Sequence, residues 1–416
     1  MFGKRITFAA ASLLMLATLA LAACGGGSSS GSGGGPINYS GSIIIWHNWQ
    51  GSYLAEKQAI FNAYTALHPK VTIQLVHQDN LVDKTITAEN AGQGPDVVAW
   101  ADDSLGKLAV GGVAVPMDKY ISKSYLESTY NKAAAEGLEF NGKVWGVPEA
   151  VEAITLMYNK SLISADQLPK TTDALVSFEQ SYAAANPGKY GIVWNPTDAY
   201  FNAPWFYGYG AQYVDSTGKV SLNNAHGIAA AKFINSLRPN LPKNIDYGVA
   251  DSLFKEGKAA AIVNGPWSYA DYAKANIKVG FATLPKITEN GNLPAKPFVG
   301  VKSLWATKSA TNLPLIADLM KFYTNKDNQI AMAKANGEIP ANLAADNDAS
   351  VTSLDTVGGF AAQAKLGTAL PNTPFMSALW DPMAKALGAI WSGSQTPDAA
   401  MASAQTAADT AIAAMK

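Results

Sequence analysis

Aromatic side chains beside carboxylates or turns are the feature of this sequence with the clearest chemical meaning. A pyranose ring needs flat aromatic surfaces for its apolar C–H faces, and carboxylates or amides for its rim of hydroxyls. The chain has ten tryptophans, and four of them meet this description: Trp49 before Gln50-Gly51, Trp100 before Ala101-Asp102-Asp103, Trp267 after Gly265-Pro266, and Trp380 before Asp381-Pro382. The pattern favours the binding of a sugar. For Trp46, Trp194 and Trp305 we expect a place in the hydrophobic core, which is the commoner fate of a tryptophan.

Residues that could catalyse a reaction are harder to find. The four histidines form no pair at metal-ligand spacing. Glu152 with Asp198 or Asp103 could serve as the two carboxylates of a glycosidase, but carboxylates that only hold sugar hydroxyls look the same in a sequence. Asp346-Asn347-Asp348 resembles the start of a calcium-binding loop. The glycine at the sixth and the glutamate at the twelfth position of such a loop are both absent, so we expect a solvent-exposed loop here. We therefore predict no catalytic residue, no metal site and no cofactor.

The first residues carry the pattern of an exported lipoprotein. Two basic residues precede an uncharged apolar run that ends in Leu21-Ala22-Ala23-Cys24, the pattern called a lipobox. We predict a signal peptide over residues 1–24 and a diacylglyceryl group on Cys24, the only cysteine of the chain. Residues 25–36 would form a flexible Gly/Ser tether. The protein would then work on the extracytoplasmic face of the cell membrane, lipid-anchored, at the cell surface or in the periplasm.

Length and charge argue against other classes of function. The 416 residues suffice for two domains that each bury a core. With no second cysteine, no disulfide is expected to staple either domain. The formal net charge is −1 and no basic run stands out, so nucleic acid is not an expected partner. We expect contact with the membrane through the lipid anchor only.

The elements that must position these side chains alternate between strand and helix. We predict, in order, a strand over residues 43–46, a helix over 53–67, a strand over 71–75, a helix to about residue 91 and a strand over 96–100. Alternating βαβ units imply a parallel sheet covered by helices. Such sheets bind ligands beyond the carboxyl ends of their strands, where Trp49, Trp100 and Asp103 stand.

The second half of the chain has the same character. Strands are predicted near residues 191–194, 260–264 and 279–284. The last helix should begin at Pro397, with Thr396 as its N-cap, and run to about residue 415. Nothing in the composition marks a boundary between domains, so we expect the chain to cross between them more than once.

Five strings of the sequence closely resemble segments of the maltose/maltodextrin-binding proteins of ABC importers. They are residues 94–101 (GPDVVAWA), 150–160 (AVEAITLMYNK), 264–269 (NGPWSY), 296–301 (KPFVGV) and 370–380 (LPNTPFMSALW). The similarity runs in order from about Ile43 to the C-terminus. The string around Trp267 (residues 264–269) and the string around Trp380 (residues 370–380) are together quite specific for this family.

This resemblance implies an α/β fold of the type II periplasmic-binding-protein class, with two lobes that close over a ligand in the cleft between them. Each lobe would hold a mixed or mostly parallel sheet flanked by helices. The implied N-terminal lobe comprises residues 37–150 and 302–345, and the C-terminal lobe comprises 151–301 and 346–416. The resemblance further implies a monomer that is not an enzyme, binds an oligosaccharide and delivers it to the transmembrane subunits of an ABC permease.

The resemblance also assigns ligand contacts. The residues on the family's stacking positions are Trp100, Tyr200, Trp267 and Trp380, and those on its hydroxyl-binding positions are Asp103, Glu152 and Asp198, with Asp83 and Tyr247 aligned less securely. Asp198 replaces the family's usual glutamate.

Two departures from the family concern its cations. An Asp-Lys pair after the first strand is replaced by Trp49-Gln50-Gly51, and an arginine is replaced by Ser104. Two cationic contacts are thus missing, and Trp49 is an added candidate contact. We predict malto-oligosaccharides, sugars like maltose and maltodextrin, as the ligand. Because buried hydroxyl-binding groups set specificity, the missing cations leave a cyclodextrin, trehalose or a non-glucan oligosaccharide as alternatives. A secreted carbohydrate-active enzyme is the alternative from another class.

Overall fold

The computed structural model describes residues 36–415. The predicted signal peptide, Cys24 and all but the last residue of the predicted tether lie outside this part of the chain. Within it, no helix has the length and apolar character needed to cross a membrane.

The first of two main sheets has seven strands. Its order is β14-β6-β13-β3-β1-β2, with β15 paired to β13. In β1 the burial alternates, with Ile43 and Ile45 buried, because successive side chains of a strand point to opposite faces. The strands are β1 (Gly41–His47), β2 (Val71–His77), β3 (Val97–Ala101), β6 (Gly146–Glu152), β13 (Phe298–Ala306), β14 (Ile339–Pro340) and β15 (Thr368–Ala369).

The second main sheet has four strands in the order β12-β7-β11-β8. All six residues of its strand β11 are buried, as expected for a strand covered on both faces. The strands are β7 (Thr155–Asn159), β8 (Tyr190–Val193), β11 (Ala259–Asn264) and β12 (Val279–Ala282). Two further pairs are β4 (Glu139–Phe140) with β5 (Lys143–Val144), and β9 (Gln212–Val214) with β10 (Val220–Ser221).

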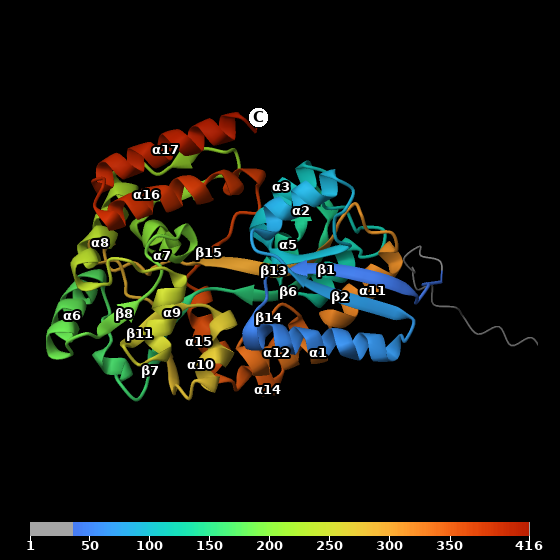
Figure 1. Ribbon diagram of the computed structural model, residues 1–416, viewed down its shortest axis with the longest axis horizontal. Coiled ribbons are helices and arrows are strands. Elements are labelled where there is room, and N and C mark those ends of the chain that lie inside the picture. Colours follow the sequence, from blue (N-terminus) through green and yellow to red (C-terminus); the bar gives the residue numbers. More distant parts are fainter. Residues whose placement is uncertain (1–35, 416) are drawn as a thin grey trace, which may run out of the picture. The chain divides into compact units, whose positions relative to one another are not determined.

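Helices surround each main sheet (Figure 1). We call the seven-stranded sheet and its helices the first lobe. Its helices are α1 (Gly51–Leu67), α2 (Leu81–Asn90), η1 (Asp102–Ser104), α3 (Leu105–Val110), α4 (Lys123–Thr129), α5 (Lys132–Gly137), α11 (Leu313–Tyr323), α12 (Lys326–Asn336) and α13 (Leu343–Asp346).

The four-stranded sheet and its helices form the second lobe (Figure 1). Its helices are η2 (Ala165–Gln167), α6 (Thr172–Ala185), α7 (Ala199–Tyr209), α8 (Ala225–Leu237), η3 (Arg238–Asn240), α9 (Tyr247–Lys255), η4 (Pro266–Ser268), α10 (Tyr269–Lys274), η5 (Thr288–Asn290), α15 (Asp355–Ala364), α16 (Trp380–Ser392) and α17 (Pro397–Ala413). Helix α14 (Ala349–Thr352) and the 3-10 helix η6 (Pro374–Ala378) belong to the segments that connect the lobes.

The prediction allowed each main sheet to be mixed or mostly parallel. Both sheets are mixed. In the first sheet β1 pairs in parallel with β2 and β3, but β13 runs antiparallel to β3 and β6. In the second, β7 runs antiparallel to both of its neighbours. The predicted changes of lobe at 150/151 and 301/302 fall inside β6 and β13, which pair with each other. The division of the chain into lobe segments stays a prediction.

The predicted strands and helices of the sequence are present, with ends shifted by a few residues. The last helix begins as expected: the Thr396 side chain accepts a hydrogen bond from the Ala399 amide, and Pro397 occupies the first helical position. Trp194 and Trp305 are core residues, at 1% and 0% exposed. Trp46 is only partly buried, because it lies on the face of β1 opposite Ile43 and Ile45.

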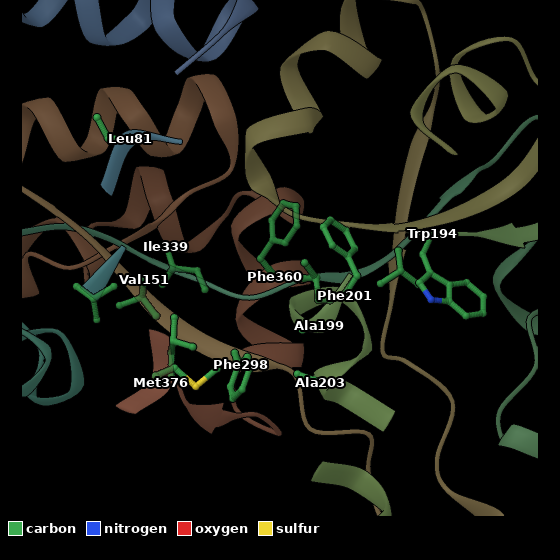
Figure 2. Packing of buried hydrophobic residues seen from close by; sticks show 14 of the residues in the cluster. Leu81, Val151, Trp194, Ala199, Phe201, Ala203, Phe298, Ile339, Phe360 and Met376 are labelled. Atoms are coloured by element: carbon green, nitrogen blue, oxygen red, sulfur yellow. The ribbon is translucent and has the colours of Figure 1, made fainter. Parts of the chain in front are cut away.

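One connected hydrophobic cluster runs through both lobes. Figure 2 shows members from distant parts of the chain, among them Val151 and Ile339, which are paired across β6 and β14. Phe201 of α7 and Phe298 at the start of β13 belong to the same cluster. Apolar side chains therefore link the first sheet to the helix that carries Tyr200, a predicted contact residue.

Candidate ligand-binding site

A pocket of about 740 Å³ lies between side chains of the two lobes. This volume is within the range of about 300–1,000 Å³ typical of small-molecule sites. The first lobe lines it with residues from β1 to the start of α1, from β3 and η1, and from β6 and β13. The second lobe adds residues from α7, α9, η4, α10 and α16.

Nine of the ten residues predicted from the sequence line this pocket. They are Trp49, Trp100, Asp103, Glu152, Asp198, Tyr200, Tyr247, Trp267 and Trp380. The structure places the tenth, Asp83, outside it. Asp83 lies in the first turn of α2 with its side chain 78% exposed, and its carboxylate pairs with Lys107 at 3.1 Å. That carboxylate is directed to solvent and to α3, so the alignment that suggested a contact does not carry over to this pocket.

The Asn-Gly-Pro-Trp string places Trp267 against its own backbone. A Cβ on Gly265 would lie 2.2 Å from the indole ring of Trp267, so only glycine lets the ring lie there. The Asn264 side chain accepts a hydrogen bond from the Gly265 amide and donates one to the Tyr272 hydroxyl, both at 2.8 Å. The indole N–H of Trp267 donates to the Tyr247 hydroxyl at 3.1 Å. Trp267 is thus a half-buried ring held at the end of β11.

The string around Trp380 ties the second lobe to the first. The backbone carbonyl of Asn372 accepts a hydrogen bond from the Gly106 amide, and a Cβ on Gly106 would lie only 2.5 Å from that oxygen. The Asn372 side chain donates to the carbonyl of Gly137 at 3.3 Å. The indole N–H of Trp380 donates to Oδ2 of Asp103 at 3.1 Å. The last predicted aromatic contact is thereby fixed beside a predicted carboxylate of the opposite lobe.

Asp198 has a structural task in addition to any contact with ligand. It is the N-cap of α7, and its Oδ1 accepts hydrogen bonds from the amides of Tyr200 at 2.7 Å and Phe201 at 3.1 Å. Burial raises the pKa of the Asp198 carboxyl, and the two amides oppose that shift. Because the cap fixes the first turn of α7, Asp198 also sets the direction of the Tyr200 ring.

Two adjacent aspartates at the end of β3 have different roles. Oδ1 of Asp102 accepts a hydrogen bond from the Val301 amide at 2.9 Å, which joins η1 to β13. Asp103 lines the pocket instead, and only 7% of it is exposed. Burial raises the pKa of the Asp103 carboxyl to about 6, against the opposing effects of Lys302 and the Trp380 N–H.

Glu152 ends β6 at the floor of the pocket, and 3% of it is exposed. Its Oε1 accepts a hydrogen bond from the Tyr53 hydroxyl at 3.1 Å, and its Oε2 lies 3.5 Å from Nζ of Lys302. Burial raises the pKa of Glu152, and Lys302 opposes that rise. The carboxylate therefore keeps a cation and a donor beside it.

A buried ionic cluster lies behind Glu152, in the first lobe. Nζ of Lys57 lies 2.7 Å from Glu149 and 2.8 Å from Glu338, and all three side chains are at most 1% exposed. The Tyr53 hydroxyl donates to Glu338 as well as to Glu152, so it joins this cluster to the pocket. Burial raises the pKa of Glu149 to about 7, although Lys57 opposes the rise.

Trp49 is in the pocket wall but mostly in the core. Only 4% of the residue is exposed. Its ring stacks on His47 at 4.8 Å between centroids, and on Phe61 and Tyr323 at 6.1 and 6.2 Å. Because other aromatic rings cover most of the Trp49 ring, it mainly supports the pocket wall and has little exposed surface on which a sugar could stack.

Several lining residues were not identified from the sequence, above all Lys302, Tyr53 and Asp271. Tyr53 is the first residue of the helix predicted over residues 53–67, and an aromatic residue in such a helix is more often part of the core. Lys302 directly follows the string at residues 296–301, and its position was the one signal that could have drawn attention to it. Asp271 of α10 accepts a hydrogen bond at 2.6 Å from the Ser52 hydroxyl of α1, a contact between elements 219 residues apart.

The pocket therefore combines aromatic rings with carboxylates that come from both lobes. Rings can cover the C–H faces of a sugar, and carboxylates can accept hydrogen bonds from its hydroxyls. Among residues 36–415, no group of three or more histidine, cysteine or acidic side chains is arranged to hold a metal ion.

Comparison with known proteins gives a family for most of this chain. The family described as bacterial extracellular solute-binding protein matches residues 59–358. Among solved structures, a maltose/maltodextrin-binding domain from Bdellovibrio bacteriovorus bound to maltotriose is similar, with a TM-score of 0.83 and 27% identity over 89% of this chain and 99% of that one. A TM-score of this size over nearly the whole of that chain shows that the two proteins share the two-lobed fold described above.

Three relatives differ in the ligand that their names state. A maltotriose-binding protein of Pyrococcus abyssi is 32% identical over 82% of this chain and 75% of its own length. A galactooligosaccharide-binding protein of Bacillus subtilis is 29% identical over 75% of each. A maltooligosaccharide ABC transporter solute-binding lipoprotein of Streptococcus pneumoniae is 28% identical over 83% of this chain and 82% of its own length.

Proposed function

Because this chain belongs to the bacterial extracellular solute-binding protein family, we propose that it captures malto-oligosaccharides and delivers them to the permease of an ABC importer. The observation that carries the proposal is the pocket itself. Trp100 of the first lobe and Tyr200 and Trp267 of the second offer aromatic faces, and Asp103 and Glu152 offer buried carboxylates. The names of the Pyrococcus and Streptococcus relatives support a glucan ligand.

Capture works through closure of the two lobes. A sugar that touches Trp100 and Trp267 at once binds the closed state better than the open one, so binding shifts the population toward closure. Contacts between lobes, such as the hydrogen bond from Trp380 to Asp103, already join the walls of the pocket. The closed protein then docks on the transmembrane subunits.

The same proposal includes the cellular setting. Cys24 would carry the lipid anchor, which agrees with the lipoprotein named among the relatives. The protein would act as a monomer on the extracytoplasmic face of the membrane and release its sugar without chemical change.

A thermal-shift panel tests the choice of ligand. Maltotriose, maltoheptaose, cyclodextrin, trehalose and a galactotriose are each added to the purified protein, because a ligand stabilises the folded state by RT ln(1 + [L]/Kd). We expect the linear malto-oligosaccharides to raise the melting temperature most. A shift with the galactotriose alone would move the assignment to the ligand named for the Bacillus relative.

The affinity for sugar should depend on pH through Asp103. The ionised carboxylate accepts hydrogen bonds from sugar hydroxyls more strongly than the protonated carboxyl does, and the pKa of Asp103 is raised to about 6. Protonation below that pKa replaces the charged acceptor with a weaker neutral one, so the dissociation constant should rise about tenfold between pH 8 and pH 5. Titration calorimetry at pH 8, 6 and 5 measures this change.

Stability of the free protein should change in the opposite direction. A carboxyl whose folded pKa is raised binds more protons in the folded than in the unfolded state, so Asp103 adds stability as pH falls through about 6. The Asp103→Asn variant is the control, since it should bind weakly with less dependence on pH. An affinity that stays constant in the wild type from pH 8 to pH 5 contradicts the assignment of Asp103.

A further inference from the structure

Lys302 occupies a central place in the pocket that neither its sequence position nor the predicted contacts explain. It lies in β13, between Ala101 of β3 and Ala150 of β6. The register of β13 against β6 shifts between Lys302 and Ser303. Such irregularities re-aim a side chain and are common beside functional sites. The side chain of Lys302 is 19% exposed and lines the pocket.

The ammonium group of Lys302 lies between the aromatic walls. Its Nζ is 5.5 Å from the ring centre of Trp100 in the first lobe and 5.8 Å from that of Trp267 in the second. Both distances are within the range of about 6 Å for a cation–π contact. A group in this position can touch a ligand that spans the two rings.

The charges that face Lys302 are carboxylates of the first lobe. Oε2 of Glu152 lies 3.5 Å away, beyond the length of a good hydrogen bond. Lys302 also lowers the pKa of Asp102 and Asp103 against the effect of burial. Within residues 36–415 its three N–H donors have no hydrogen-bond acceptor at ordinary length, so they are free to bind a ligand oxygen.

The other lysine of the pocket differs from Lys302. Lys255 of α9 lies at 2.7 Å from Asp251, one turn earlier on the same helix, so its charge is already engaged. Lys302 is therefore the lysine of the pocket whose ammonium is held less closely by a carboxylate.

We propose that Lys302 is a specificity-determining ligand contact, which donates hydrogen bonds from its ammonium to the hydroxyl or ring oxygens of a neutral sugar held between Trp100 and Trp267. The inference rests on the proposed function. The carboxylates of Asp103 and Glu152 accept from sugar hydroxyls, and Lys302 supplies the donors that they lack. The acidic residues that line the pocket, Asp103, Glu152, Asp198, Asp251 and Asp271, outnumber its lysines, Lys255 and Lys302. The pocket therefore selects uncharged sugars over acidic ones.

The test compares Lys302→Met with the wild type by titration calorimetry with maltotriose at pH 7.5. Methionine keeps most of the apolar stem and removes the charge. We expect the affinity to fall roughly tenfold to a hundredfold, the range for loss of a charged hydrogen bond. Lys308→Met is the matched control, because Lys308 is an exposed lysine just after the same strand, and it should bind like the wild type. Lys302→Arg keeps a cation and should lose less affinity than Lys302→Met.

A second readout separates contact from packing. Without Lys302, the charges and donors left around Glu152 are Tyr53, Glu338 and Lys57, and those around Asp103 are Trp380, Ser104 and Asp102. Both carboxyls then take up protons at higher pH, so the loss of affinity on acidification should begin at higher pH in Lys302→Met than in the wild type. If Lys302→Met does not fold, Lys302→Gln takes its place, because glutamine also removes the charge and should give the same loss of affinity and the same shift of the pH profile.

The outcomes distinguish the two proposals. Wild-type protein that binds maltotriose while Lys302→Met binds it within twofold, with the same pH profile, overturns the role of Lys302 alone. Wild-type protein that binds no malto-oligosaccharide overturns the proposed function, and with it this inference.

Discussion

Trp267→Ala is expected to weaken the binding of malto-oligosaccharide by at least about 30-fold, the usual effect of removing a tryptophan that anchors a ligand. The ring lines the pocket, 6.4 Å from the Tyr200 ring between centroids and 5.8 Å from Nζ of Lys302. Its loss removes the face against which a sugar ring can stack. Because Trp267 is half-buried at the pocket and not in the core, the melting temperature of the free protein should change little. Titration calorimetry and thermal unfolding measure the two effects.

Two milder variants identify which property of Trp267 matters. Trp267→Phe keeps a flat ring and should retain much of the affinity. Tyr247→Phe removes the hydroxyl that accepts the indole N–H at 3.1 Å, and should cost only a few-fold. Equal affinity of Trp267→Ala and the wild type would show that the sugar does not stack on this ring.

Lys57→Met should have the largest effect on stability, about 3–5 kcal/mol, because removing one partner of a buried ion pair leaves uncompensated charge. Nζ of Lys57 is the cation beside Glu149 at 2.7 Å and Glu338 at 2.8 Å, and none of its own side chain is exposed. The change should also weaken sugar binding, since Tyr53 joins Glu338 to Glu152. Urea unfolding followed by circular dichroism measures the stability.

The pH dependence gives this prediction a specific signature. Without Lys57 the pKa of Glu149, already raised to about 7, should rise further. A carboxyl whose pKa is raised in the folded state stabilises that state as the pH falls and it takes up a proton. The loss of unfolding free energy in Lys57→Met should therefore be smaller at pH 5 than at pH 8. The control is Lys107→Met, which breaks the exposed pair with Asp83 and should cost less than about 1 kcal/mol. Comparable losses in the two variants would contradict the account of Lys57 as the cation of a buried ionic cluster.

Much of the fold could be predicted because local signals and tertiary structure agree. Alternating apolar and polar residues at 71–75 predicted a strand, and this strand is β2. Thr396 and Pro397 predicted the start of the last helix, and α17 begins at Pro397 with Thr396 as its N-cap. Trp267 and Trp380, two of the predicted aromatic contacts that line the pocket, lie in strings whose glycine or asparagine positions them. Gly265 makes room for Trp267, and Asn372 fastens the segment that leads to Trp380.

The rest depends on contacts between distant parts of the chain. Trp49 was predicted as a ligand contact, but its ring is stacked between His47 and Phe61, because α1 and α11 close over it. Asp83 aligns with a contact position, but the first turn of α2 directs it to Lys107. In the sequence, nothing distinguishes Lys302 from other polar residues of strands. Its surroundings come from distant parts of the chain: Trp100 from β3, Glu152 from β6 and Trp267 from the second lobe. Local sequence patterns do not predict contacts between residues that are far apart in the chain.

The structure also shows where closure of the lobes can be tuned. The Ser52 hydroxyl of α1 donates to Asp271 of α10 at 2.6 Å, and a Cβ on Gly51 would lie 2.9 Å from the same carboxylate. This contact joins the lobes at the rim, and the hydrogen bond from Trp380 to Asp103 joins them at the wall. The opening of the lobes that is part of the proposed function would break both hydrogen bonds, so each would favour the closed state.

The most direct test of the proposed function is a calorimetric titration of the purified wild-type protein with maltotriose, followed by chromatography of the sugar. We predict saturable binding of one maltotriose per protein, with tighter binding than that of a galactotriose, and recovery of the trisaccharide unchanged. No heat with any malto-oligosaccharide, or release of glucose or maltose during the incubation, would contradict the account of this chain as a receptor for malto-oligosaccharides.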